Sequence, residues 1–427
     1  MDMPLPKSWA EKTLREICEP TKLWNPQRDA RDEFWYIDVS AVSRESFAIR
    51  EPQRIKGIEA PSRARKIVQS GDAIFATVRP TLRRVAFVSP EFNDQIASTA
   101  FCVVRANREK ASPRFLYYLL LTDFLNEEIA KFESGANYPA VNDKDVLDRI
   151  VPLPPKPEQE KIAAVLWKVQ CAIEVEDKLI ATARELKQSA MRQLFTCGLR
   201  SEPQKETDYG ALPDSWPTQP LGLCCVVQTG VTKGRKIPPE EALEVPYLRV
   251  ANVQDGHLDL REMKTIIIRR DELEGYLLQD GDVVLTEGGD FDKLGRGFIW
   301  RGEVANCVHQ NHIFAVRANR AVLLPEFLAY LVQSPYGRSY FLTVAHKTTN
   351  LACINATKLK AFPVPLPPRD EQREIVSILE TIDRKISVHK RKRATLQELF
   401  KTLLHQLMTG QIRVHDLDVD VSEVAEC

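Results

Sequence analysis

Two stretches of the chain place apolar residues at alternating steps of three and four, the spacing of a helix with one narrow apolar stripe. Glu176 and Lys187 interrupt the first stripe, and His389 and Arg393 interrupt the second. The apolar positions are Ile162, Leu166, Val169, Ile173, Ile180, Ala183, Ala190 and Leu194, then Ile375, Leu379, Ile382, Ile386, Leu396, Phe400, Leu403 and Leu407. The pattern predicts two long helices.

Each of these helices needs a partner for its stripe, because tertiary packing supplies most of the stability of such a helix. At ~1.5 Å per residue the first stripe extends about 50 Å, further than one small domain reaches. We therefore expect the two helices to pair with each other, and packing of each helix on its own globular domain is the alternative. Antiparallel pairing would give the chain an approximate internal two-fold axis and would set Glu176 opposite Arg393.

The segments before each long helix have the β-branched and aromatic content of strands. In the first half these segments are "DAIFATV", "RVAFV" and "TAFCVVRA", and in the second they are "DVVLTE", "GFIW" and "HIFAVRA". A short helix is expected after each set, from about Pro113 and from about Pro325. The fold class is therefore mixed α/β (α+β), with two globular domains and two long helices.

The two halves also share an order of short motifs, which indicates an internal repeat. The matched pairs are "LPKSW" and "LPDSW", "QSGDAIF" and "QDGDVVL", "VRANR" at Val104 and at Val316, and "LPPKPEQEKI" and "LPPRDEQREI". The last pair reads as two helix entrances, since proline tolerates a first turn and carboxylates favour the N-terminal end of a helix. The expected parts are a first globular domain (1–152), a helix (153–200), a second globular domain (201–363), a helix (364–413) and a tail (414–427).

Composition sets limits on the class of protein. The 427 residues are 44% hydrophobic and 28% charged, and neither a membrane span nor a signal segment is recognisable, so a cytoplasmic protein is expected. The nine cysteines form no C-x-x-C pair, which suits reduced thiols. Net charge is zero, but residues 44–84 contain ten Arg or Lys and four Asp or Glu. A solvated basic surface and nucleic-acid contact are both open for that segment.

Catalytic motifs are not found. The sequence contains no G-x-x-x-x-G-K-[ST] phosphate loop, no H-E-x-x-H and no G-x-S-x-G. Cys307, His309 and His312 stand at i, i+2 and i+5, and on a strand this spacing points their side chains to both faces, which disfavours a shared metal ion. No catalytic residue and no metal ligand is therefore assigned.

Binding candidates are the amide, basic and aromatic side chains of predicted loops. Gln310 and Asn311 can pair bidentately with adenine, and arginine can reach guanine or phosphate. The loops "GANYPAVN" and "HKTTNLACIN" stand at matching places before the two helix entrances. Polar residues that merely solubilise hairpin tips are the alternative. The candidate DNA-binding residues are Arg79, Arg83, Arg84, Tyr138, Asn142, Lys233, Arg235, Lys293, Arg296, Gln310, Asn311, His312, Lys347 and Asn350.

The doubled "PLPP…EQ" entrances, the closing "QLMTGQIRV" and the segments "VPYLRVANVQDGHLDL" and "LQDGDVVLTEGG" resemble the specificity subunit of a type I restriction-modification enzyme. The resemblance extends from Leu5 to Val414. Two segments depart from the pattern. "LFTCGLR" replaces the "LMTG" form after the first helix, and "FWYIDVSAV" is the nearest counterpart of "VPYLRVANV" in the first half.

The resemblance implies a non-catalytic DNA-reading subunit. Its two globules would be target recognition domains, each for one half of a split, asymmetric DNA site, separated by an antiparallel coiled coil. It also implies two modification subunits that transfer methyl from S-adenosylmethionine to adenine N6, and restriction subunits that use ATP and Mg²⁺. This chain is expected to bind none of these cofactors itself.

Two other classes remain as alternatives. A self-sufficient DNA methyltransferase or nuclease is disfavoured by the missing motifs. A coiled-coil scaffold that carries two binding modules and does not bind DNA is disfavoured by the arginine and amide side chains of the loops.

Overall fold

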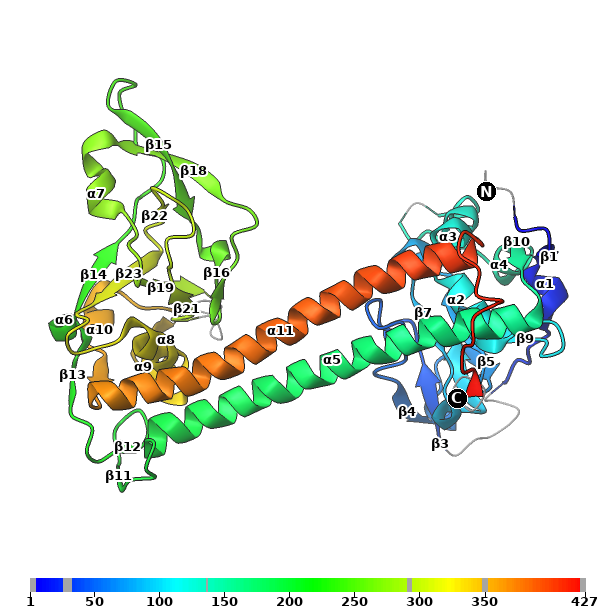
Figure 1. Cartoon of the computed structure of the whole chain (residues 1–427), viewed down its shortest axis with the longest axis horizontal. Coiled ribbons are helices and arrows are strands. Elements are labelled where there is room, and N and C mark those ends of the chain that lie inside the picture. Colours follow the sequence, from blue (N-terminus) through cyan, green and yellow to red (C-terminus); the bar gives the residue numbers. More distant parts are fainter. Residues whose placement is uncertain (1–4, 26–32, 136, 290–293, 348–351, 423–427) are drawn as a thin grey trace. The chain divides into compact units, whose positions relative to one another are not determined.

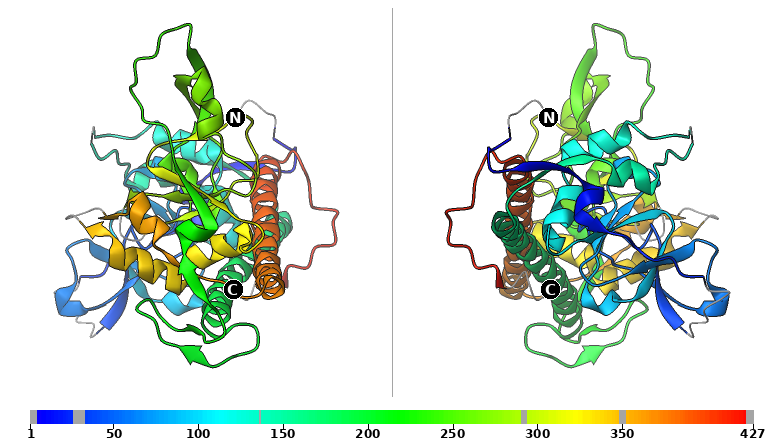
Figure 2. Two further views of the ribbon diagram at one scale, coloured as in Figure 1. Left: turned by 90° about the vertical axis from the view of Figure 1, so that its left-hand side faces the viewer. Right: turned by 90° about the vertical axis from the view of Figure 1, so that its right-hand side faces the viewer.

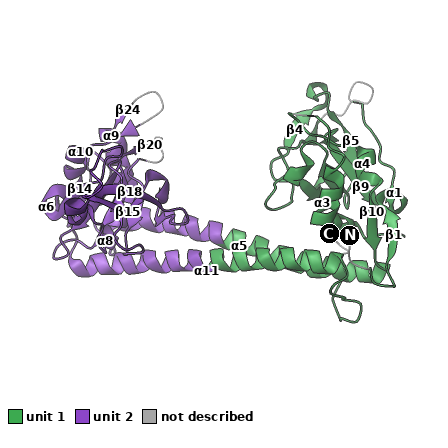
Figure 3. Cartoon of the chain, turned by 90° about the horizontal axis from the view of Figure 1, so that it is seen from above, with its two compact units in different colours: residues 1–179, 389–427 green, residues 180–388 purple. Residues whose placement is uncertain are grey.

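The computed structural model describes residues 5–25, 33–135, 137–289, 294–347 and 352–422. The chain divides into two compact units (Figure 3), unit 1 within residues 1–179 and 389–427 and unit 2 within residues 180–388. Each unit combines a mixed α/β globule with one segment of each long helix, α5 (Lys156–Cys197) and α11 (Arg369–Met408) (Figure 1). The predicted mixed α/β fold and the two long helices are therefore confirmed.

Unit 1 is built on two four-stranded sheets, ordered β2-β9-β6-β7 and β4-β3-β8-β5. Their strands are β2 (Cys18–Glu19), β3 (Glu33–Ile37), β4 (Gln53–Lys56), β5 (Ala64–Val68), β6 (Ala73–Ala76), β7 (Val85–Phe87), β8 (Gln95–Ser98) and β9 (Phe101–Ala106). Helix α2 (Pro113–Leu120) lies against β6, β7 and β9. Strands β6 and β9 are almost wholly buried, because apolar residues occupy both of their faces.

Shorter elements complete unit 1. Strand β1 (Ala10–Thr13) pairs antiparallel with β10 (Ile150–Leu153), which brings the start of the globule to the start of α5. The remaining elements are α1 (Leu14–Ile17), η1 (Gly57–Glu59), η2 (Pro80–Leu82), η3 (Pro90–Phe92), α3 (Asp123–Ala130) and α4 (Asp143–Leu147).

Unit 2 contains a four-stranded sheet ordered β14-β23-β19-β21 and a three-stranded sheet ordered β18-β15-β22. Their strands are β14 (Cys225–Thr229), β15 (Ala242–Leu248), β18 (Lys264–Arg269), β19 (Val283–Thr286), β21 (Gly297–Ile299), β22 (Val308–His309) and β23 (Ile313–Ala318). Helix α8 (Pro325–Gln333) lies against β19, β21 and β23. The antiparallel ladder of β15 and β18 projects from the rest of this unit (Figure 2).

Shorter elements of unit 2 surround these sheets. They are β11 (Gln204–Lys205), β12 (Leu212–Pro213), β13 (Thr218–Pro220), α6 (Leu221–Cys224), η4 (Val250–Asn252), β16 (Val253–Gln254), β17 (His257–Leu258), η5 (Arg270–Glu272), α7 (Leu273–Tyr276), β20 (Gly288–Gly289), α9 (Pro335–Val344), β24 (His346–Lys347), β25 (Ala352–Cys353), α10 (Ala356–Lys360) and β26 (Pro363–Pro365). Strand β13 pairs antiparallel with β26, as β1 does with β10 in unit 1.

The shared motifs make equivalent contacts in the two units. The aspartate of each "GD" motif is buried and binds the arginine of each "VRANR" motif, Asp72 to Arg105 and Asp282 to Arg317, both at 2.7 Å. A buried carboxylate requires such a partner, because its charge is otherwise costly to remove from water. The repeated sequence thus encodes an equivalent internal ion pair in each globule.

The repeated helix entrances anchor each long helix to its globule through a buried glutamine. Gln159 accepts a hydrogen bond from the Ser112 amide at 2.9 Å and donates to the Pro154 carbonyl at 2.9 Å. Gln372 makes the same pair of bonds, with the Leu324 amide and the Pro367 carbonyl, each at 2.9 Å. The "EQ" dipeptide therefore fixes the start of each helix against the segment that leads into α2 or α8.

The two long helices run in opposite directions within unit 1. Near the start of α5, Glu158 accepts hydrogen bonds from Arg413, just beyond the end of α11, at 2.6 and 2.8 Å. Further along α5, Glu176 accepts from His389 and Lys392 of α11, each at 2.7 Å. The two helices also run in opposite directions within unit 2. Lys187 of α5 binds Asp383 of α11 at 2.7 Å, and further along α5's direction the Leu199 amide binds Glu371, near the start of α11, at 3.3 Å.

The central polar layer differs from the predicted pairing of Glu176 with Arg393. Arg393 donates to Asp177 at 2.8 Å, whereas Glu176 is occupied by His389 and Lys392. Side chains of paired helices interdigitate, so Glu176 lies opposite the turn of α11 that carries His389 and Lys392. The long side chain of Arg393 reaches Asp177 at the edge of the apolar stripe. Glu176 is only 2% exposed, and the hydrogen bonds from Lys392 and His389 lower its pKa.

Candidate nucleic-acid interface

In unit 1 the turn between β6 and β7 carries three of the predicted arginines. Arg79 and Arg83 flank η2 with φ of 49° and 51°, a left-handed conformation that non-glycine residues rarely adopt. The Arg79 guanidinium lies 4.8 Å from the ring centroid of Tyr138, which is 70% exposed. This stack presents hydrogen-bond donors and an aromatic face side by side, a combination that suits bases and phosphates.

Arg79 also donates to the Asn137 carbonyl at 3.4 Å, and the other predicted residues of unit 1 likewise have partners inside the protein. Arg83 forms an ion pair with Asp123. Arg84 donates to the carbonyl oxygens of Val39 at 2.8 Å and Val42 at 2.5 Å, and so holds the turn that follows β3. Asn142 is the N-cap of α4.

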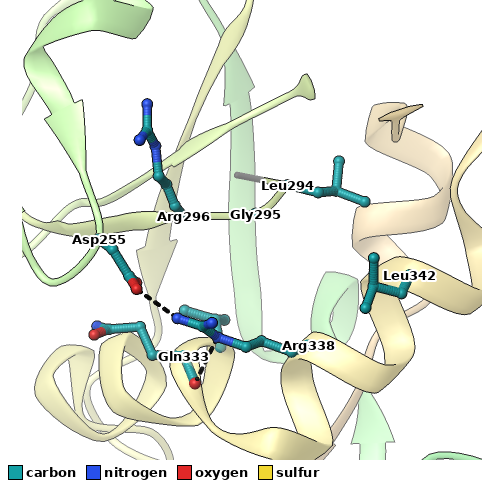
Figure 4. A pocket seen from close by; sticks show the side chains of 8 residues that line it. Asp255, Leu294, Gly295, Arg296, Gln333, Arg338 and Leu342 are labelled. Carbon is teal, nitrogen blue, oxygen red and sulfur yellow. Dashed lines mark hydrogen bonds and ion pairs between the residues drawn. The ribbon is translucent and has the colours of Figure 1, made fainter. Parts of the chain in front are cut away.

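In unit 2, Arg296 precedes β21 as Arg84 precedes β7, but within the described residues its side chain donates to no backbone carbonyl. Its Nε is buried and has no hydrogen-bond partner among the described residues. Arg296 lines a small pocket (Figure 4) together with Asp255, Leu294, Gly295, Val332, Gln333, Arg338 and Leu342. Arg338 of this pocket is paired with Asp255 at 2.5 Å, and the Arg296 side chain points away from that pair.

The segment between β22 and β23 carries Gln310, Asn311 and His312. The backbone amides of Gln310 and Asn311 bond to the carbonyls of Leu248 and Val231, and their side chains are half-buried. The His312 ring is 56% exposed, and its Nδ1 donates to Glu287 at 2.7 Å. That bond fixes the ring orientation, and among the described residues the second ring nitrogen has no partner that would prevent contact with a ligand.

His309 points to the opposite side of this segment. It is fully buried, its Nδ1 donates to the Ile313 carbonyl at 2.9 Å, and burial lowers its pKa to about 4. His309 is buried and His312 is exposed, so the two rings lie on different faces, as the strand spacing predicts. Within the described ranges, no group of three or more His, Cys, Asp or Glu is arranged to hold a metal ion.

The basic loop after β14 contains the last two described candidates. The Lys233 ammonium lies 5.3 Å from the ring centroid of Tyr247. Arg235 forms two hydrogen bonds to Glu272, at 2.9 and 2.7 Å, which raise the pKa of Arg235 and lower that of Glu272. Lys233 is therefore the more available cation.

Three candidates are not described as side chains. Lys293 and Asn350 lie outside the described residues. Lys347 is described only through its backbone, which belongs to β24. These three therefore remain expectations from the sequence.

Glu287 is a site residue that sequence reasoning missed. It stands 25 residues before His312, and neither residue type nor spacing signals their contact. The two meet because β19 and β23 are paired, with the Glu287 amide bound to the His312 carbonyl at 2.9 Å just beyond the ladder. Only knowledge of the strand register could have found this pair.

Each unit is thus a mixed α/β globule with polar and basic loops beside one four-stranded sheet, β2-β9-β6-β7 in unit 1 and β14-β23-β19-β21 in unit 2, a class suited to binding a ligand. A family model described as "Type I restriction modification DNA specificity domain" matches residues 6–184 and again 214–398. The chain belongs to this type I restriction-modification DNA specificity family and contains its domain twice.

Named relatives agree with this assignment. The chain is 27% identical to the MjaVIII specificity subunit of Methanocaldococcus jannaschii, over 70% of this chain and 71% of that protein. It is 25% identical to the EcoKI specificity subunit of Escherichia coli, over 66% and 61%. The chain spans about half the length of a third relative, MjaX of the same archaeon, at 24% identity over 51% of each protein.

Solved structures support the fold over nearly the whole chain. A chain from a study of assembly and conformational transition in the type I restriction-modification system is 29% identical, covers 96% of this chain and all of that one, and superposes with a TM-score of 0.59. The S subunit from M. genitalium superposes with a TM-score of 0.55 at 15% identity and shows a shared fold. No helix in the described part of the chain is long and apolar enough to cross a membrane.

Proposed function

We propose that this chain is the DNA-reading specificity subunit of a type I restriction-modification complex and itself catalyses no reaction. It recognises a bipartite, asymmetric DNA site, one half-site per recognition domain. The observation that carries this proposal is the match of one DNA specificity domain to each half of the chain. The matching strand order of the sheets β2-β9-β6-β7 and β14-β23-β19-β21 supports it.

In this proposal residues 1–152 and 201–363 are the two target recognition domains. Residues 153–200 and 364–413 form an antiparallel coiled coil that relates the halves by an approximate two-fold axis, and residues 414–427 are a tail. The opposed helix directions within each unit, seen in the Glu176–Lys392 and Lys187–Asp383 ion pairs, support this arrangement.

Direct DNA contact is assigned to those candidate side chains that internal ion pairs or capping bonds do not hold in place. The Arg79–Tyr138 stack serves the first domain, and Arg296, His312, Gln310, Asn311 and Lys233 serve the second. The amides of Gln310 and Asn311 suit adenine, and arginine suits guanine or phosphate. Arg83, Arg84, Asn142 and Arg235 shape the interface through their internal partners. Lys293, Lys347 and Asn350 are kept as contacts on sequence grounds alone.

The proposed partners are two modification subunits, docked on the long helices, and restriction subunits that join the complex. Exposed apolar side chains on both helices support docking of a further protein, namely Val175, Leu179, Leu186, Ile378, Val388 and Leu399. The modification subunits would use S-adenosylmethionine and the restriction subunits ATP and Mg²⁺, and this chain would hold none of them. A role on genomic DNA would place the protein in the cytoplasm.

Replacement of one recognition domain tests the proposal. Residues 10–150 are exchanged for the matching span of a relative, the chain is assembled with its modification subunits, and methylated sites are mapped across a genome. One half-site should change and the other should persist. As a matched control, exchange of residues 221–361 should change only the other half-site. A change of both halves in either chimera, or no sequence-dependent methylation, would contradict the proposal.

A further inference from the structure

The two long helices share an apolar stripe but carry opposite charges at its centre. Positions 213 residues apart are equivalent in the repeat. By this rule Glu176, Asp177, Leu179 and Ile180 of α5 correspond to His389, Lys390, Lys392 and Arg393 of α11. The centre of α5 is therefore acidic and the centre of α11 is basic.

Inside unit 1 these opposite charges meet. Glu176 accepts from His389 and Lys392 at 2.7 Å, and Asp177 accepts from Arg393 at 2.8 Å. Glu176 is almost completely buried, so its charge depends on these hydrogen-bond donors rather than on water. The acidic centre of α5 is satisfied by the basic centre of α11.

Pairing of two like helices would lose this match. If α5 faced α5 of a second copy, the repeat would put a second Glu176 where His389 stands and Leu179 where Lys392 stands. Two carboxylates would then be buried together without a cation. If α11 faced α11, the cations of both copies would converge instead. Like charges repel most strongly at the buried position of Glu176, and less strongly among the α11 side chains, which are 28–64% exposed.

A second layer, within unit 2, is also specific to unlike helices. Lys187 of α5 binds both carboxylate oxygens of Asp383 of α11, at 2.7 and 2.8 Å. The Tyr330 hydroxyl donates to the same carboxylate at 2.8 Å. This layer is half-buried, which makes the loss of either partner costly for the other.

The equivalent layer of unit 1 contains no charge. Gln170 stands in place of Asp383 and Phe400 in place of Lys187. Gln170 accepts from the Tyr118 hydroxyl at 3.0 Å, and Phe400 packs on the Tyr118 ring with centroids 6.0 Å apart. Two like helices would therefore set Lys187 against Gln170, or Asp383 against Phe400.

We propose that these two layers restrict pairing, so that α5 accepts α11 and rejects the α5 helix of a second copy, and α11 likewise rejects α11. The partner that fits the acidic centre is a helix with a basic centre, which in this protein is α11. Two copies of this chain consequently do not join through equal halves, although each half repeats the other. This inference goes beyond DNA reading and does not depend on it.

Exchange of the central residues in the full chain tests the inference. One variant gives α11 the residues of α5, through His389→Glu, Lys390→Asp, Lys392→Leu and Arg393→Ile. The converse variant gives α5 those of α11, through Glu176→His, Asp177→Lys, Leu179→Lys and Ile180→Arg. A third variant combines both exchanges. Arg391→Glu, at an exposed position of the same turn, is the control for surface charge.

The readout is the thermal unfolding midpoint at low and high salt. Each single exchange should lower the midpoint, and high salt should reduce the loss because it screens like charges. The double exchange should restore the midpoint close to that of the wild type, since opposite charges meet again, and Arg391→Glu should change little. Single exchanges as stable as the wild type, or a double exchange as unstable as the single ones, would overturn the inference.

Discussion

At the scale of single residues, the same side chain performs different tasks in the two repeats. Arg84 and Arg296 occupy equivalent places before β7 and β21, yet Arg84 is bound by backbone carbonyls, whereas the buried Nε of Arg296 has no partner among the residues that the structure describes. Residue type and spacing predict both as DNA contacts. The structure separates an arginine that stabilises the fold from one that is available to a ligand.

This difference predicts that the two alanine substitutions affect different properties, stability for Arg84 and DNA binding for Arg296. Arg84→Ala should lower the free energy of unfolding by about 1–3 kcal/mol, because the carbonyls of residues 39–42 lose a charged donor. Arg296→Ala should leave that free energy within about 0.5 kcal/mol, since its side chain forms no hydrogen bond to the described residues, and should weaken DNA binding. Urea unfolding and DNA titration of the assembled complex measure the two effects. An Arg296→Ala protein that unfolds easily while binding normally would contradict the assignment.

The buried His309 predicts a dependence of stability on pH. Burial lowers its pKa from 6.5 to about 4, so above pH 6.5 the ring is neutral in both the folded and the unfolded chain. As pH falls from 6.5 towards 4, His309 becomes protonated in the unfolded chain but stays neutral in the folded chain. The free energy of unfolding therefore falls, by up to about 3 kcal/mol.

His309→Asn should flatten this dependence between pH 6.5 and 4, as measured by urea unfolding at several pH values. His312→Asn, at the exposed ring three residues later, is the matched control and should keep the steep dependence. Equal slopes in His309→Asn and the wild type would show that His309 is not the group responsible.

At the scale of elements, the long helices begin where a buried glutamine binds the preceding segment. Gln159 and Gln372 each join a proline-rich entrance to the segment that leads into α2 or α8. The apolar stripe fixes the helix face, whereas this glutamine fixes where the helix attaches to its globule.

Removal of either glutamine should destabilise its own unit. Gln159→Ala leaves a buried Ser112 amide and the Pro154 carbonyl without partners, at a cost of about 2–4 kcal/mol. Gln372→Ala should act similarly in unit 2. Glu160→Ala, at the next position, should have little effect. Hydrogen exchange of α2 and α8 measures where protection is lost, and equal loss in both units after one substitution would contradict a local role.

At the scale of the whole molecule, the proposed coiled coil predicts the spacing of the two half-sites. One heptad inserted after Leu179 and another after Val388 keeps the stripe and the ion pairs of each unit, and adds about 10 Å at ~1.5 Å per residue. That length corresponds to about three base pairs. Three base pairs also turn the duplex by roughly 100°, so the original site should bind poorly.

Selection of bound fragments from a library with a randomised spacer tests this prediction. The lengthened protein should select unchanged half-sites with a longer spacer. A chain with the heptad after Leu179 alone serves as the control, because its helices fall out of register and it should bind weakly to every spacer. An unchanged preferred spacer would show that the partners, rather than these helices, measure the DNA.

The sequence by itself determined the repeat, the two long helices and three strands in each half, which are β6, β7 and β9 in unit 1 and β19, β21 and β23 in unit 2. These features follow from local periodicity, and "DAIFATV", "RVAFV" and "TAFCVVRA" indeed contain β6, β7 and β9. Family membership also follows from the sequence, because it rests on the order and spacing of motifs and not on which side chains contact each other.

Only the tertiary structure decided which polar groups meet. The contact of Glu287 with His312, the carbonyl ties of Arg84 and the choice of Lys392 over Arg393 as a partner of Glu176 all join residues distant in the chain. Local patterns specify which face a residue occupies. Hydrogen bonds depend on strand register and helix stagger to within a fraction of an ångström, and these are set by the packing of the entire unit.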